Sequence, residues 1–209
     1  MRAIKHVICF LIVIVFVTGA VDAQSNNPGG QTNFDFSRFD NLPTFRSIPW
    51  GASKDYVLRN DDSQRIETGQ DFLRLRNKLG DLEVDITYFF WRGHHIKGTY
   101  LTTQNLGEYS NYIERYNWLK SLLSQKYGSP KIDLMNWADH SFKNQPNRWL
   151  TAVSRGHLEH FAFWEEEDIV ISIRLGAVNQ RPSILVEYFI KNFDAEMDQT
   201  DDAEVLRKL

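Results

Sequence analysis

Cysteine is almost missing from this sequence of 209 residues. The single cysteine, Cys9, lies in an apolar stretch near the N-terminus that is predicted to be removed as a signal peptide. The remaining chain then has no thiol, which excludes disulfide bonds, thiolate metal sites and a cysteine nucleophile. An exported domain of this kind must be stabilised by its hydrophobic core, and the chain is long enough to form one.

A strong charge of one sign is also missing. The chain has 24 basic and 27 acidic side chains, for a net charge of −3. This balance, and the dispersal of the basic residues, argue against nucleic acid or acidic lipid as the partner. There is no Gly-x-Gly-x-x-Gly motif and no phosphate-binding loop, and nothing indicates a cofactor. Aromatic residues are plentiful at 13 % with six Trp, which indicates a substantial core.

Residues 1–23 resemble a secretory signal peptide. Arg2 and Lys5 precede an apolar run over residues 7–20, and Val21 and Ala23 occupy the −3 and −1 positions of a cleavage site. The run is shorter than the roughly 20 residues that span a bilayer, so no membrane span is expected after cleavage. An uncleaved N-terminal anchor is the alternative. We expect a bacterial protein in the periplasm or outside the cell.

The rest of the chain divides by composition. Residues 24–44 are predicted to be a flexible linker, although Phe34, Phe36, Phe39 and Leu42 could pack onto the domain surface. Residues 45–193 are predicted to form one domain, and residues 194–209 an acidic C-terminal tail.

Apolar residues in alternate positions predict strands over residues 72–76, 82–91, 96–103, 157–165, 169–178 and 183–191. Most of these are joined in hairpin order, and the helices fall between the runs of strands. This order is typical of an α+β fold with an antiparallel sheet of five to six strands and helices on one face. The chain contains a short internal echo: Phe90-Trp91 and Phe163-Trp164 each lie five residues before an Ile. Either a duplicated unit or chance explains this echo.

Three helical segments are predicted. Asn105 and Glu108 match a capping box for a long helix over residues 105–127, which Gly128 ends. Ser53 is a suitable N-cap for a short helix over residues 54–59 with Tyr56 and Val57 turned inward. A helical turn is expected over residues 149–155.

The opening pattern Phe45-x-x-Ile48-x-Trp50-Gly51-x-Ser53-x-x-x-Val57 resembles that of a family of small exported bacterial proteins of unknown function. The helix exit, Leu123-x-x-Lys126-Tyr127-Gly128-x-Pro130, is similar as well. The Gly51-x-Ser53-x-x-x-Val57 core also resembles small outer-membrane-assembly lipoproteins and the β-lactamase-inhibitor-protein fold. The resemblance implies short helices against an antiparallel sheet and a role in binding other proteins. It implies no catalytic residue.

Histidine is the one residue type that could support an enzymatic alternative, a metal-dependent hydrolase. His94 and His95 are predicted at a hairpin tip, and His157 and His160 on one strand. Neighbours in a strand point to opposite faces, and so do residues three apart, so neither pair can chelate an ion alone. Glu165-Glu166-Glu167-Asp168 is interpreted as a solvated hairpin turn. Asp139-His140-Ser141 lacks the nucleophile elbow that a hydrolase would need.

The aromatic surplus allows two interpretations, and burial in the core is the favoured one. Phe89 and Trp91 point away from the face formed by Leu82 to Phe90. If both sheet faces are covered, these two rings belong to the core, and if their face is open, they form a binding surface. The candidate binding residues are Phe89, Trp91, His94, His95 and Trp164. We expect a non-enzymatic binding protein whose partner is another envelope or extracellular protein.

Overall fold

The computed structural model describes residue 39 and residues 41–191. The predicted signal peptide, most of the predicted linker and the acidic tail lie outside the described residues. Among the described helices, none is long and apolar enough to cross a membrane.

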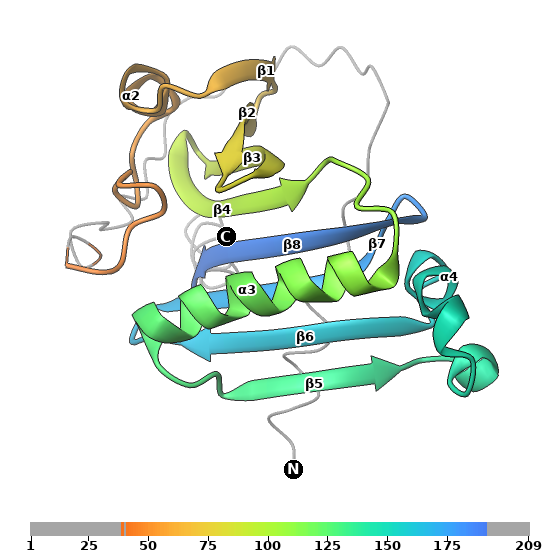
Figure 1. The fold of residues 1–209 in the computed structure, drawn as a ribbon. Helices are drawn as coiled ribbons and strands as arrows, with labels where there is room; N and C mark the ends of the chain where they lie inside the picture. The colour runs from red at the N-terminus through yellow and green to blue at the C-terminus, as the bar shows by residue number, and fades with distance from the viewer. Residues whose placement is uncertain (1–38, 40, 192–209) are drawn as a thin grey trace, which may run out of the picture. The chain divides into compact units, whose positions relative to one another are not determined.

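Eight antiparallel strands form one sheet in the order β1-β2-β3-β4-β8-β7-β6-β5 (Figure 1). This confirms the α+β class and the antiparallel sheet, but the sheet is larger than the five to six strands expected. The strands are β1 (Gln64–Thr68), β2 (Phe72–Leu79), β3 (Leu82–Trp91), β4 (His94–Thr102), β5 (Ile132–Trp137), β6 (Leu158–Glu165), β7 (Ile169–Val178) and β8 (Arg181–Ile190).

The two strands that the sequence did not predict are the two edges of the sheet. All five residues of β1 are exposed, and β5 has no fully buried residue. Strands were predicted from alternation between a buried and an exposed face. An edge strand with neither face buried has no such alternation, so the sequence pattern predicted neither β1 nor β5.

Three α-helices accompany the sheet, namely α2 (Lys54–Asn60), α3 (Tyr109–Tyr127) and α4 (Trp149–Ser154). Short 3-10 turns, η2 (His140–Phe142) and η3 (Pro146–Arg148), precede α4. Helix α2 begins as predicted, with the Ser53 side chain accepting a hydrogen bond from the Tyr56 amide. Val57 is buried as expected, but Tyr56 is 38 % exposed rather than inward.

Helix α3 begins at Tyr109, four residues later than predicted, because the capping box does not form. Glu108 is the N-cap and makes no capping bond through its side chain. The Asn105 side chain instead accepts a hydrogen bond from the Gly107 amide, which closes a tight turn before the helix. Gly107 has a φ of 80°, a left-handed conformation that glycine adopts readily.

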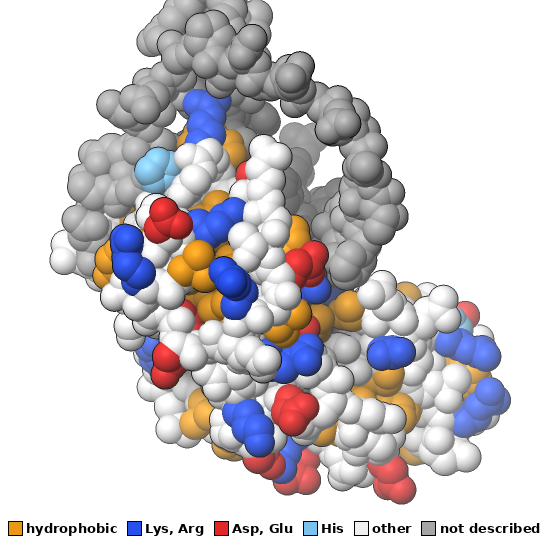
Figure 2. Space-filling model, turned by 90° about the horizontal axis from the view of Figure 1, so that it is seen from above, with side chains coloured by type: hydrophobic (Ala, Val, Ile, Leu, Met, Phe, Trp, Pro, Cys, Tyr) orange, Lys and Arg blue, Asp and Glu red, His pale blue; other side chains and the backbone are white. Residues whose placement is uncertain are grey.

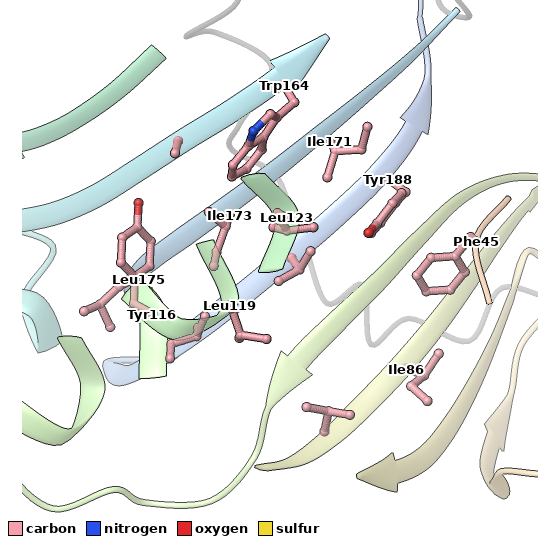
Figure 3. Packing of buried hydrophobic residues seen from close by; sticks show 14 of the residues in the cluster. Phe45, Ile86, Tyr116, Leu119, Leu123, Trp164, Ile171, Ile173, Leu175 and Tyr188 are labelled. Carbon is pink, nitrogen blue, oxygen red and sulfur yellow. The ribbon is translucent and has the colours of Figure 1, made fainter. Parts of the chain in front are cut away.

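The hydrophobic core lies on one face of the sheet. Helix α3 packs against β7 and β8, and its buried stripe meets alternate residues of those strands (Figures 1 and 3). Leu119 and Leu123 from the helix and Ile171, Ile173 and Tyr188 from the sheet are all buried. Helix α4 adds Ala152 and Val153 at the end of the same layer.

The β1–β4 half is covered differently, by the irregular segment of residues 41–53, here called the entry segment. Phe45 and Ile48 are each 1 % exposed and Trp50 is 4 % exposed. The Phe45 ring lies against Gly98, where an added Cβ would come within 2.2 Å of the ring. Phe39 is buried and Leu42 packs against the core, so the folded part of the chain begins before residue 45 and includes part of the predicted linker.

The fold contains a repeat of architecture. Helix α2 precedes the meander β1–β4, helix α3 precedes β5–β8, and the two halves join where β4 pairs with β8. The Phe-Trp echo does not follow this repeat. Phe90-Trp91 ends the third strand of the first half, whereas Phe163-Trp164 lies near the end of the second strand of the second half. The echo is therefore not evidence for the repeat.

Gly51 supplies the first prediction. Its φ is 80°, and its amide donates a 2.8 Å hydrogen bond to the His95 carbonyl, which fastens the entry segment to β4. A side chain strains this conformation, so Gly51→Ala should lower the free energy of unfolding by about 1–2 kcal/mol, and β-branched Gly51→Val by more. Gly176→Ala is the control, since an added Cβ there makes only ordinary contacts. Equal melting temperatures for Gly51→Ala and the wild type would contradict the prediction.

Candidate functional site

The face of the sheet opposite α3 carries a row of three partly exposed aromatic rings and one lysine across four neighbouring strands. Phe72 of β2 pairs with Phe89 of β3, Phe89 pairs with Lys97 of β4, and Lys97 pairs with Phe189 of β8. Paired residues of antiparallel strands lie on the same face with their Cβ atoms about 5 Å apart. We call Phe72, Phe89, Lys97 and Phe189 the aromatic row.

Burial on this face is uneven. All four members of the aromatic row are partly exposed, and no described helix lies over this side of the sheet (Figure 1). Nearer β6, the rings of Phe161 and Phe163 are each 8 % exposed and Leu185 is 4 % exposed. The accessible part of this face is therefore the part that contains the aromatic row.

Cations lie over the rings of the aromatic row. The Lys97 ammonium is 5.6 Å from the centre of the Phe89 ring, and the Arg74 guanidinium is 5.8 Å from the centre of Phe72. Each cation is also paired with a carboxylate, Lys97 with Glu187 at 2.7 Å and Arg74 with Glu67 at 2.9 Å. The row thus offers apolar ring surface with fixed, compensated charges. Such a surface is suited to contact, selected by shape, with a partner whose surface is uncharged or carries charges of both signs.

The hairpin between β3 and β4 carries two of the predicted binding residues. Trp91 is partly exposed, and the guanidinium of Arg92 lies 4.5 Å from its ring centre. His94 is exposed, and its Nδ1 lies 2.9 Å from the Gly51 carbonyl oxygen. Both residues therefore lie beside the junction between the hairpin and the entry segment.

His95 and Trp164, also predicted as binding residues, are buried. A bulge in the β3–β4 pairing skips Ile96, so His95 faces the core beside Phe90. Trp164 is 1 % exposed and donates a 2.8 Å hydrogen bond from Nε1 to the Gly128 carbonyl at the end of α3. The sequence did not reveal the bulge, so it could not place His95 in the core. Neither side chain can reach a partner in this conformation.

His95 is a packing residue of the core. Its ring stacks on Trp50 with ring centres 4.9 Å apart and an angle of 14°. Burial lowers the pKa of His95 to about 4, so the ring is neutral at neutral pH. Nδ1 lies 3.5 Å from the Pro49 carbonyl, and Nε2 is buried with no hydrogen-bond partner among the described residues. With the proton on Nδ1, the unpaired atom is an acceptor and not a donor.

A buried ion pair attaches the entry segment to α2 and β3. Arg46 binds Asp61 through Nε and Nη2 at 2.8 and 3.1 Å, and the Tyr88 hydroxyl donates to the same carboxylate at 2.6 Å. Burial alone would raise the pKa of Asp61, but hydrogen bonds from Arg46, Ser63 and Tyr88 outweigh it and lower the pKa to about 2. Arg46 also has a φ of 54°. The pairing explains this backbone strain as the cost of pointing Arg46 at Asp61.

His160 belongs to a second polar cluster, under α3. Its Nε2 lies 2.6 Å from the Tyr109 hydroxyl, and burial lowers its pKa to about 4. Burial raises the pKa of Tyr109 to about 12, so the hydroxyl keeps its proton and donates it to the histidine. The two groups form a neutral hydrogen-bonded pair between β6 and the first turn of α3.

Among the remaining chemistry-bearing residues, His157 and Asp139 come close together: Nδ1 of His157 lies 3.8 Å from a carboxylate oxygen of Asp139. His157 stacks on Phe142 with ring centres 5.7 Å apart, and Asp139 accepts hydrogen bonds from the amide and hydroxyl of Ser141. Glu165 ends β6 and pairs with Lys131 and Lys191. Over residues 41–191, no three His, Asp or Glu side chains come together in a way that could hold a metal ion.

Comparison with protein-family models, with curated proteins and with solved structures finds no match. The family resemblance drawn from the entry motif therefore stays a prediction.

The members of the aromatic row that sequence reasoning missed are Phe72, Lys97 and Phe189. The alternation of β8 already turns Phe189 away from the buried residues Tyr188 and Ile190. What the sequence lacks is the register, since β4 and β8 are more than 80 residues apart and nothing local aligns Lys97 with Phe189.

The buried ion pair gives a pH-dependent prediction. Asp61→Asn leaves Arg46 without its counter-ion and should lower the free energy of unfolding at pH 7 by on the order of 2–3 kcal/mol. The folded-state pKa of Asp61, about 2, lies below its ordinary value of 3.8. The contribution of the pair is therefore complete above about pH 5 and is lost as the pH falls toward 2. The stability difference between wild type and variant should shrink over the same range in denaturant titrations.

The control is Asp85→Asn. Asp85 makes a similar bond to Arg76, whose side chain is 48 % exposed. An exposed pair is worth about 0–1 kcal/mol, so this variant should remain close to wild type. Equal losses for the two variants would show that burial of the Arg46–Asp61 pair has no special effect.

Proposed function

We propose that this protein is an exported, non-enzymatic binding protein that contacts another envelope or extracellular protein through the face of the aromatic row. The observation that carries the proposal is the continuity of Phe72, Phe89, Lys97 and Phe189 across four strands, with each side chain partly exposed. The signal-peptide pattern of residues 1–23 supports export.

The chemistry of the aromatic row favours a protein as the partner. Aromatic side chains and arginine dominate the energetic centres of protein interfaces, while the charged rim contributes mainly to specificity. In the aromatic row, Lys97, which is paired with Glu187, lies between Phe89 and Phe189, and the Arg74–Glu67 pair lies beside Phe72. The rings are also held by a rigid sheet, so little conformational entropy is lost on binding.

Four polar groups with shifted pKa values support a binding role for another reason. Asp61, Arg46 and Tyr88 are bound to one another, and His95 is stacked in the core. Their perturbation is accounted for by the attachment of the entry segment. We therefore assign these groups to stability and not to catalysis.

Capture experiments with matched variants test the proposal. The chain from Gln24 onward, carrying an affinity tag, is used to capture a partner from an envelope extract of the cells that express it. Phe89→Ala and Phe189→Ala should each weaken the captured complex at least about tenfold, as expected for central aromatic contacts. Their melting temperatures should fall little, because both rings are partly exposed. Affinity is measured with the purified partner by titration calorimetry.

Leu122→Ala is the matched control, because Leu122 is 42 % exposed on helix α3 and therefore away from the row. It should leave the affinity unchanged. If all three variants bind the captured protein as tightly as the wild type, the aromatic row is not the binding surface.

A further inference from the structure

The two edges of the sheet are built differently. Strand β1 carries Arg65 and Glu67, and its pairing with β2 is interrupted by a register shift between them. Viewed from the β1 end, basic and acidic side chains are interspersed over the surface (Figure 2). Charges and irregular pairing are the features by which proteins prevent another strand from adding to a sheet edge. The β1 edge is thus protected.

Strand β5 has less of this protection. Its six residues, Ile-Asp-Leu-Met-Asn-Trp, pair with β6 in unbroken register and contain no Lys, Arg or Pro. Its one charged residue, Asp133, is paired with Lys120 of α3 at 2.8 Å. Among the described residues, no strand pairs with the outer side of β5. Alternate residues therefore present unpaired backbone N–H and C=O groups there.

On each face of the sheet, β5 has one exposed apolar side chain beside one exposed polar residue, Asp133 or Asn136. Leu134 is 39 % exposed and Met135 is 40 % exposed. As neighbours in a strand, they point to opposite sides. A strand added to this edge would therefore satisfy the backbone groups and cover apolar surface above and below the sheet.

We propose that β5 pairs antiparallel with β5 of a second copy of this chain, joining two eight-stranded sheets into one. This two-fold arrangement brings the same strand of each copy together. The unpaired backbone groups and the exposed apolar side chains of β5 are therefore present on both sides of the contact. Strand β5 lies at the opposite end of the sheet from β2, β3 and β4, which carry most of the aromatic row. The inference is therefore independent of the proposed function.

The sequence of β5 permits this pairing with itself. In an antiparallel pair, facing residues share a sheet face, so the two-fold axis passes through one residue position. With the axis at Leu134, Leu134 faces its own copy, Ile132 faces Asn136 and Asp133 faces Met135. Like charges meet only if the axis passes through Asp133. The register centred on Leu134 avoids this repulsion and places the two leucines in contact.

Sedimentation equilibrium of the chain from Gln24 onward tests the proposal. The wild type should be a dimer that dissociates on dilution. Leu134→Lys places like charges opposite each other and should raise the dissociation constant at least about tenfold. Ile66→Lys is the matched control, since Ile66 is 40 % exposed on the protected edge β1, and it should dissociate like the wild type. Both positions are exposed, so circular dichroism should show the same fold for the two variants and the wild type.

A cross-linking experiment locates the contact. The chain from Gln24 onward has no cysteine, so Leu134→Cys introduces a single thiol. Mild oxidation should convert Leu134→Cys to a covalent dimer and leave Ile66→Cys without a covalent cross-link. A wild type that is monomeric at every concentration would overturn the proposal. Equal dissociation of Leu134→Lys and Ile66→Lys, or no preference for Leu134→Cys in the cross-linking, would overturn it as well.

Discussion

The contact between Phe45 and Gly98 is the constraint on which the rest of the structure depends. A single sheet of eight strands must be covered along one face, and α3 packs against β7 and β8 in the half that follows it. The other half has the seven-residue helix α2 and relies on the entry segment. Gly98 provides the space, because any side chain there would collide with the Phe45 ring. Phe45 then contacts Tyr88, Tyr100 and Tyr188, and so links strands from both halves.

This arrangement explains why several polar groups with shifted pKa values serve the fold. The entry segment forms no strand of its own, and it is attached by the backbone hydrogen bonds of Gly51 and Ala52 to His95 and by side chains. Arg46 binds Asp61, Trp50 stacks on His95, and the Trp50 Nε1 donates to the Pro43 carbonyl. The described helices and the entry segment pack on one face of the sheet, and Phe89 and Phe189 are partly exposed on the other. The proposed binding surface is thus a consequence of the way in which the core is closed.

Sequence reasoning succeeded where one face of an element is buried and failed where that asymmetry is missing. The alternation of Leu82 to Phe90 defined β3, and Ser53 defined the start of α2. The exposed edges β1 and β5 carry no alternation, and the bulge at Ile96 reverses the side on which His95 lies. Within the candidate site, the outward direction of Phe89 was predictable. Its alignment with Phe72 and Phe189 was not, because register depends on pairing between distant strands.

Native-state hydrogen exchange tests most directly the claim that the entry segment is an integral part of the core. The amide of Gly51 donates to the His95 carbonyl at 2.8 Å, and the amide of His95 donates to the Ala52 carbonyl at 2.9 Å. If the claim is correct, these amides open only when the whole sheet unfolds. Their opening free energies should then equal that of Ile86 in the middle of β3. Opening free energies several kcal/mol lower than that of Ile86 would contradict the account, because the entry segment would then detach while the sheet stays folded.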